Sequence, residues 1–401
     1  MKTRNRWIIL AASVLANLCI GSAYAWSVFQ KPLIEMFGFG TSQANLAYTI
    51  SLSMIPLTMI VSGKLQAKIG CRYTLALGSI IFGTGMFLAG YTNGIAILYI
   101  TYGFLGGAGI GLVYGCTVPN AVKWFPDKRG LAGGVIAGGF GFGAVLFAPL
   151  SANLIASIGV LSTFRIEGIA FVIVVILASL LVSPPPTGYV PAGWTPPAQA
   201  AGREVENYTT GGMLKKFKFW ILWVMYTIGC VAGLMIIGHA SPIGQERAGI
   251  TPEAAASAVA LLGIANTSGR LLWGAISDWI GRYRSLMIMY ALTGVSLLLL
   301  NSAGSYWTFI ISVMGVALCF GGVLGVFPSI TADNFGTQHL GINYGVMFSA
   351  FGIAAFVGPR LAADIRESSG DYSLAFIIAS CLSVAGILLT VLISITSKRK
   401  T

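Results

Sequence analysis

The sequence predicts an all-α membrane protein, with twelve transmembrane helices in two pseudo-symmetric six-helix bundles. Of its 401 residues, 56% are hydrophobic and 9% are charged, whereas soluble domains average about 25% charged residues. The mean hydropathy is +0.82. The chain also holds 52 glycines, a residue that is commoner in membrane helices than in soluble ones.

Twelve apolar runs are long enough to cross a bilayer, which takes about 20 helical residues. They lie near residues 7–29, 43–62, 74–91, 94–117, 131–156, 164–182, 217–239, 254–276, 285–302, 306–327, 341–359 and 373–396. The first run follows three basic residues and contains Ala23-Tyr24-Ala25, as cleaved signal peptides do. Because this run is too long for a signal peptide and many more follow it, we interpret it as an uncleaved first helix.

The Lys and Arg residues predict the orientation of the chain. An even number of helices puts both termini on one side, and that side carries 18 Lys and Arg residues against five opposite. The five are Lys31, Arg165, Arg247, Arg360 and Arg366. By the positive-inside rule both termini are cytoplasmic, which predicts a multi-pass protein of the cytoplasmic (inner) membrane. The net charge of +12 follows from this topology, so the expected partner is the lipid bilayer and not a nucleic acid.

One long polar stretch divides the chain. Residues 183–216 open with Pro184-Pro185-Pro186 and carry further Pro and Gly residues, a composition typical of a linker. We predict an N-terminal six-helix bundle over 1–182, a cytoplasmic linker over 183–216 and a C-terminal six-helix bundle over 217–401.

Glycine motifs repeat between the two halves at a spacing of 211 residues. The matched pairs are Gly63 and Gly274, Gly70 and Gly281, Gly130 and Gly341, and Gly134 and Gly345. In the second half, Asp278 and Arg282 lie one helical turn apart, and we predict a cytoplasmic gate or latch that breaks and reforms. The alternative is a solvated pair, because exposed ion pairs contribute only about 0–1 kcal/mol.

Six cysteines are scattered along the chain, five of them in apolar runs: Cys19, Cys71, Cys116, Cys230, Cys319 and Cys381. Their spacing does not match a metal site, so we expect small buried residues and neither metal ligands nor disulfides.

Arg270 lies in the middle of the apolar run 255–276, and we place no other Lys, Arg, Asp or Glu inside a membrane segment. A charge at this depth costs at least about 2.5–3.5 kcal/mol and usually faces a cavity or a partner. Arginine stays protonated. Since we expect no carboxylate in another membrane segment, we predict that Arg270 binds an external anion. The alternative is pairing with a protein carboxylate or with carbonyls of a broken helix.

Other polar and aromatic side chains are candidates for the same site. Asn266 lies one turn before Arg270 on the same helix face and can bind a second substrate oxygen, or instead bond between helices. Further candidates are Tyr24, Trp26, Tyr114, Asn120, Phe140, His239, Phe320 and Phe351. For each of them, packing between helices is the alternative.

Several motifs resemble a known family. The loop Gly274 to Arg284 has the pattern G-x-x-x-D-x-x-G-R-x-R, which together with the two six-helix halves resembles the major facilitator superfamily. Trp124-Phe125-Pro126-Asp127-Lys128-Arg129-Gly130-Leu131 and Ser268-Gly269-Arg270-Leu271-Leu272-Trp273-Gly274 resemble the oxalate/formate antiporter family, which includes bacterial monocarboxylate transporters. The resemblance covers nearly the whole chain and implies the major facilitator fold and a monomer.

The resemblance also implies roles for single residues. Aromatic residues wall the family's site around the arginine, and by local motif these are Tyr24, Tyr114, Phe140 and Phe320. Leu324 stands where the oxalate exchanger has another aromatic residue. Phe351 stands where oxalate exchangers have a lysine that helps bind the second carboxylate. In the first motif loop, Ala67 replaces the acidic residue usual in the family, so we expect no latch there.

One cation favours a substrate with one negative charge. A dicarboxylate facing Arg270 alone would leave a buried charge that costs several kcal/mol. We therefore predict a small monocarboxylate such as lactate, pyruvate, formate or acetate, moved by alternating access.

We prefer proton-coupled symport, and carboxylate exchange of the oxalate/formate type is the alternative. His239, near the outer end of the seventh helix, is the candidate for proton coupling, since histidine titrates near neutral pH. It could instead be a polar residue at a helix end, with the proton carried by the substrate or by water near Arg270.

Two other functional classes are less favoured. The sequence shows no nucleophile–base set, metal cluster or cofactor loop, so we expect neither an enzyme nor a cofactor. A carboxylate sensor would need a larger cytoplasmic domain than the linker.

Overall fold

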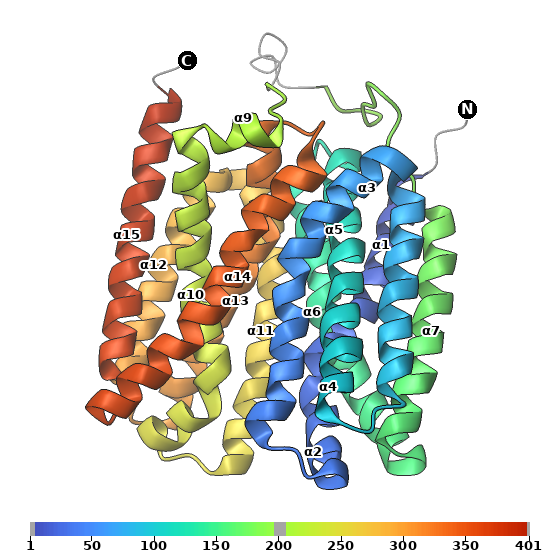
Figure 1. The fold of residues 1–401 in the computed structure, drawn as a ribbon. Coiled ribbons are helices and arrows are strands. Elements are labelled where there is room, and N and C mark those ends of the chain that lie inside the picture. The colour runs from blue at the N-terminus through green and yellow to red at the C-terminus, as the bar shows by residue number, and fades with distance from the viewer. Residues whose placement is uncertain (1–4, 196–205, 399–401) are drawn as a thin grey trace. The chain divides into compact units, whose positions relative to one another are not determined.

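A computed structural model describes residues 5–195 and 206–398, and all regular elements in these ranges are helices (Figure 1). In chain order they are α1 (Arg6–Gly21), η1 (Ser22–Ala25), α2 (Trp26–Phe37), α3 (Thr41–Ala89), α4 (Ile95–Leu98), η2 (Tyr99–Gly106), α5 (Gly107–Trp124), α6 (Arg129–Ile158), α7 (Val160–Leu181), α9 (Thr210–Leu214), α10 (Phe217–Ala248), α11 (Pro252–Ile280), α12 (Arg282–Asn301), α13 (Tyr306–Phe335), α14 (Leu340–Ser369) and α15 (Ser373–Lys398).

The predicted all-α membrane fold is confirmed. Within the described residues, eleven helical stretches are long and apolar enough to cross a membrane. One of them, α3, has 49 residues, about twice the length of a single crossing. Its backbone is not helical at Gly70, so α3 covers the predicted segment 43–62 and the predicted segment 74–91 up to Ala89.

The two motif loops share one backbone conformation. Gly70 has φ 83° and ψ 164°, and Gly281, between α11 and α12, has φ 93° and ψ 151°. Glycine adopts positive φ at little cost, whereas a side chain at these positions would be strained. The sequence repeat therefore has a structural counterpart at the turn that ends each motif.

The chain forms two compact units. The first comprises Met1–Thr210 and Thr331–Ser349, and the second comprises Gly211–Ile330 and Ala350–Thr401. The end of α13 and the start of α14 thus belong to the first unit. The division into 1–182, 183–216 and 217–401 stays a prediction.

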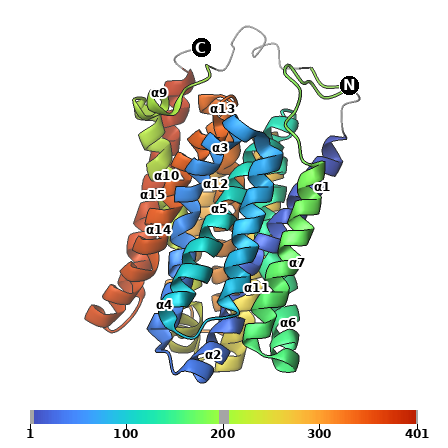
Figure 2. The ribbon, with the colours of Figure 1, turned by 45° about the vertical axis from the view of Figure 1, so that its right-hand side comes forward.

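In the first unit, α1, α3, α5, α6 and α7 run side by side, and α2 and α4 lie at one end of this unit (Figures 1 and 2). Glycines permit close approach of these helices. A Cβ atom at Gly143 of α6 would lie 2.5 Å from the carbonyl oxygen of Leu18 in α1. An ion pair between Arg6 and Asp127, 2.6 Å apart, holds the start of α1 beside the loop between α5 and α6.

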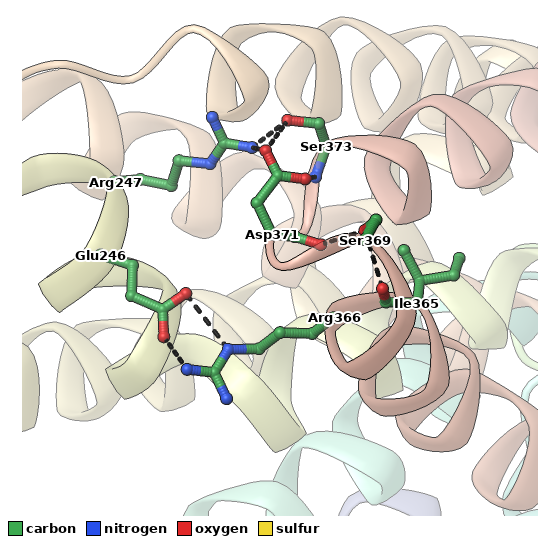
Figure 3. Close-up of polar contacts among 7 residues, drawn as sticks. All are labelled: Glu246, Arg247, Ile365, Arg366, Ser369, Asp371 and Ser373. Atoms are coloured by element: carbon green, nitrogen blue, oxygen red, sulfur yellow. Dashed lines mark hydrogen bonds and ion pairs between the residues drawn. The ribbon is translucent and has the colours of Figure 1, made fainter.

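In the second unit, α12 and α15 run side by side (Figure 1), and a buried apolar cluster joins residues of α10 to α15. One end of this unit carries a polar network that ties α10 to the α14–α15 turn (Figure 3). Arg247 contacts Asp371 at 3.0 Å, and Arg366 pairs with Glu246. The Ser373 hydroxyl and the Ser373 backbone N–H both donate to Asp371. These hydrogen bonds, the one from the hydroxyl most of all, lower the pKa of that carboxyl group.

The cysteines differ in part from the prediction. Cys71 of α3 and Cys116 of α5 form a disulfide, with Cα atoms 5.9 Å apart, so the expectation of no disulfide is wrong for this pair. Their 45-residue separation carries no signal in the sequence, because the packing of α3 on α5 brings them together. Cys381 is exposed and not buried, whereas Cys19, Cys230 and Cys319 are buried as predicted.

Candidate functional site

Arg270 is buried in the middle of α11. Its side chain is 2% exposed, although α11 is among the helices apolar enough to span a membrane. The Arg270 Nε–H donates to Asn266 Oδ1 at 3.0 Å, and Asn266 is 7% exposed. The predicted pair therefore lies on one face of α11, one helical turn apart.

The backbone around this pair is packed against α13 through glycines. A Cβ atom at Gly325 of α13 would lie 2.6 Å from the Arg270 carbonyl oxygen. A Cβ atom at Gly321 would overlap the Asn266 carbonyl oxygen, and one at Gly269 would overlap the carbonyl oxygen of Leu318. Because interiors are close-packed and resist such overlaps, these glycines fix the height and rotation of Arg270 within the second unit.

The other predicted residues of the second unit are also buried. Phe320 and Leu324 flank the glycines of α13 and are 3% and 2% exposed. The Phe320 ring lies against Gly233 of α10, where a Cβ atom would overlap it. Phe351 of α14 is 3% exposed. These three side chains are thus buried and belong to the same unit as Arg270.

Three predicted aromatic residues lie together in the first unit. The Phe140 ring makes edge contacts with Tyr24, at 4.8 Å between centroids, and with Tyr114, at 5.5 Å. Phe348 joins this aromatic cluster through Tyr114, at 5.7 Å. Sequence reasoning did not single out Phe348, although it lies three residues before Phe351. Whether these residues contact a substrate stays a prediction.

His239 makes two contacts through its ring nitrogens. Nε2 lies 3.0 Å from the carbonyl oxygen of Pro359, and Nδ1 lies 3.3 Å from the Tyr372 hydroxyl. A carbonyl oxygen only accepts, so Nε2 donates to it, and in a neutral ring Nδ1 accepts from the Tyr372 hydroxyl. A neutral imidazole is therefore fully hydrogen-bonded here, which suits the structural alternative for this residue.

The predicted pair in the second motif loop is formed. Arg282 Nη1 lies 2.7 Å from Asp278 Oδ1, and each side chain is 16% exposed. Arg282 also donates to the Ser277 hydroxyl at 2.6 Å. Its use as a latch stays a prediction.

The first motif loop differs from the second in that its residues line a pocket of about 160 Å³, which belongs to the first unit. Ala67, Gln66 and Lys123 are among its lining residues. Also within the first unit, Arg129 pairs with Asp333 at 2.6 Å and so ties the start of α6 to the end of α13. Sequence reasoning missed this pair, because the two residues lie 204 positions apart.

The expectation that Arg270 is the only ion in a membrane segment is wrong. Glu167 lies in α7, within the predicted segment 164–182, and is 3% exposed. Its Oε1 accepts from the Ser151 hydroxyl at 2.5 Å. Arg165 lies in the same helix, with its guanidinium 5.0 Å from the Tyr91 ring centre. The sequence did contain a signal for this residue, because Glu167 is a carboxylate within an apolar run. Our count of charges considered only Lys and Arg and so did not include it.

No metal-type grouping of three His, Cys, Asp or Glu side chains occurs in residues 5–195 and 206–398. A buried, hydrogen-bonded cation in a helical multi-pass fold is typical of a membrane transporter, since charges inside membrane segments usually mark pathways for ions or substrates.

Comparison with known proteins agrees with this class. The model of the Major Facilitator Superfamily matches residues 7–359 and 235–401, so the chain belongs to this superfamily. It is 32% identical to an uncharacterized MFS-type transporter of Escherichia coli, YhjX, over 88% of this chain and 86% of that protein. It is 29% identical to the oxalate:formate antiporter of Oxalobacter formigenes, over 94% of this chain and 89% of that protein.

Two further comparisons are more distant. Monocarboxylate transporter 13 of Rattus norvegicus is 23% identical over 94% of this chain and 86% of that protein. The crystal structure of the human organic anion transporter MFSD10 superposes with a TM-score of 0.75, at 16% identity, covering 96% of this chain and 99% of that chain. These findings establish a major facilitator transporter with relatives in the oxalate/formate antiporter family.

Proposed function

We propose that this protein is a secondary active transporter of small monocarboxylates, such as lactate or pyruvate. It works by alternating access in the cytoplasmic membrane, as a monomer with both termini in the cytoplasm. The substrate leaves chemically unaltered, because the role proposed for each residue is binding and not bond breaking.

The observation that carries this proposal is the buried guanidinium of Arg270, hydrogen-bonded to Asn266 at 3.0 Å. A guanidinium presents parallel N–H donors that match the two oxygens of a carboxylate. The hydrogen bond to Asn266 holds the Nε side of the guanidinium and thereby fixes the orientation of this planar group. The pair is thus suited to bind one carboxylate group.

The substrate class follows from charge and from the relatives. Phe351 occupies a position where a lysine would supply a second cation for a dicarboxylate, and its side chain is buried and apolar. The named relatives include an oxalate:formate antiporter and a monocarboxylate transporter. Together these support a monocarboxylate whose apolar end contacts side chains such as Phe320, Leu324 and Phe351.

For coupling we propose symport with a proton, and His239 was the candidate from the sequence. An exchange of two carboxylates is the second candidate, supported by the similarity to the oxalate:formate antiporter. A pH step distinguishes the two: external acidification accelerates net uptake by a symporter and leaves a strict exchanger unchanged.

The test is counterflow in proteoliposomes that contain the purified protein. Vesicles are loaded with unlabelled lactate, pyruvate, formate, acetate or oxalate and diluted into labelled lactate. We expect lactate and pyruvate to drive accumulation of the label, and oxalate to drive less. Faster counterflow with oxalate than with lactate and pyruvate would contradict the monocarboxylate assignment.

A further inference from the structure

Glu167 is a buried carboxyl group that the carboxylate-binding role of Arg270 does not use. It lies in α7 seven residues after Val160, about 10 Å along the helix. By the predicted topology this end of α7 faces the outside. Ser151, its hydrogen-bond donor, is fully buried and lies seven residues before the end of α6 at Ile158.

One carboxyl oxygen of Glu167 is satisfied and the other is not. Oε1 accepts from Ser151 at 2.5 Å, whereas Oε2 is buried and has no hydrogen-bond partner in the part of the chain that the structure describes. None of the ion pairs among the same residues involves Glu167. An ionised carboxylate buried without a cation is costly, whereas the neutral acid is not. Binding a proton at Oε2 removes this cost.

Several charged and titratable groups lie on the helices packed against α7. On α2, Lys31 and Glu35 pair with each other at 3.8 Å and are exposed. On α7 itself, Arg165 lies over the Tyr91 ring. The remaining groups are Arg6 and Cys19 of α1, Tyr48, Lys64, Lys68, Arg72 and Tyr73 of α3, and Arg129 of α6.

Tyr102 of η2 contacts the segment that carries Tyr24, a member of the aromatic cluster of Tyr24, Tyr114, Phe140 and Phe348. Its buried hydroxyl donates to the carbonyl oxygen of Ala23, the residue before Tyr24, at 3.4 Å. Its ring contacts Phe164, three residues before Glu167 on α7, at 5.9 Å between centroids. Tyr102 therefore joins the part of α7 that carries Glu167 to the segment of Tyr24, within the first unit.

We propose that Glu167 is the proton-binding group of this transporter. In each cycle one proton from the outer solution binds Oε2 and one monocarboxylate anion binds at Arg270, so the pair crosses the membrane without net charge. The proton then leaves Glu167 and the anion leaves Arg270 on the cytoplasmic side. This assignment rests on the proposed monocarboxylate transport, and it replaces His239 as the residue that couples.

The test uses the full chain in proteoliposomes, with Glu167→Gln and the matched control Glu35→Gln. Glutamine keeps the shape of the protonated acid but cannot exchange a proton. Glu167→Gln is expected to retain lactate counterflow, which needs no net proton movement, and to lose pH-gradient-driven uptake by at least about tenfold. Glu35→Gln, at an exposed carboxyl group of the same unit, is expected to behave as the parent in both assays.

Infrared difference spectroscopy gives a readout that does not depend on transport. Titration of the parent should show the carbonyl band of a protonated carboxyl group that is absent in Glu167→Gln and shifted in Ser151→Ala. If the unmodified protein shows no lactate counterflow, the proposed function is refuted. The infrared titration then still tests whether Glu167 binds a proton. A parent-like pH response in Glu167→Gln, loss of counterflow in the folded variant, or an unchanged band would each overturn the assignment.

Discussion

Arg270 in the second unit and Glu167 in the first are buried ionisable side chains that are held in similar ways but differ in what can neutralise them. Both form a hydrogen bond with a neutral side chain, Arg270 with Asn266 at 3.0 Å and Glu167 with Ser151 at 2.5 Å. Arginine keeps its charge at every accessible pH, so its counter-ion must be an anion. A carboxylate can be neutralised by a proton. The comparison teaches that a permanent charge is suited to bind an anionic substrate, whereas a charge that protonation can remove is suited to couple transport to protons.

The largest effect is expected from removing the fixed charge. Arg270→Ala and Arg270→Lys should both reduce lactate counterflow by about 100-fold or more, since an ammonium group lacks the two-pronged donor set of a guanidinium. Arg165→Lys is the matched control and should leave counterflow unchanged. Substantial transport by Arg270→Lys would show that charge suffices and that the fork is not needed.

A second change neutralises the charge of Arg270 with a carboxylate of the protein itself. Asn266→Asp keeps the side-chain shape and places a carboxylate on Arg270 Nε, so a substrate anion would have to compete with an internal one. We expect counterflow to fall about as far as in Arg270→Ala, while thermal stability is kept or raised, because hydrogen bonds between charged groups are stronger than neutral ones. Asn266→Ala should lose less, about tenfold, as one hydrogen bond to a charged group is removed.

A third change adds a fixed charge. Phe351→Lys should lower lactate counterflow and raise that of oxalate, because a second cation can balance the second carboxylate. The ratio of oxalate to lactate counterflow measures this shift. Phe356→Lys, at a site on the same helix that is 66% exposed, is the control and should leave the ratio unchanged. No rise in the ratio for a folded Phe351→Lys would contradict the charge argument.

Charges nearer the surface should matter less than either buried ion. Asp278→Asn breaks the 2.7 Å pair with Arg282, whose side chains are 16% exposed. We expect the rate of transport to change only about two- to fivefold, since such pairs contribute about 0–1 kcal/mol. The half-saturating lactate concentration should stay constant. A change in that concentration without a change in rate would argue against a latch.

The smallest effect is expected in the exposed network around Asp371. Its pKa lies below the ordinary value of 3.8, chiefly because the Ser373 hydroxyl donates to it. The carboxylate therefore stabilises the fold above that value, and this stabilisation is lost as the pH falls through the lowered pKa. The melting temperature of Asp371→Asn should differ slightly from the parent near neutral pH and converge with it in acid. A difference that grows on acidification would contradict this sign.

Local patterns in the sequence determined much of this protein. Apolar runs and the Lys/Arg bias are properties of short segments, and they predicted the helical membrane fold. The 211-residue repeat predicted two equivalent loops, and Gly70 and Gly281 indeed share one conformation. Asn266 and Arg270 could be paired in advance, because helical spacing alone places them on one face.

The tertiary structure decided what depends on contacts between distant helices. The Cys71–Cys116 disulfide, the Arg129–Asp333 pair and the junction of Phe348 with Tyr114 join residues far apart in sequence, for which spacing carries no information. Glu167 can be identified in the sequence, but the sequence does not say whether a carboxyl group near a helix end is exposed to water. Only the packing of α6 on α7 buries it against Ser151, and burial is what makes its charge state matter.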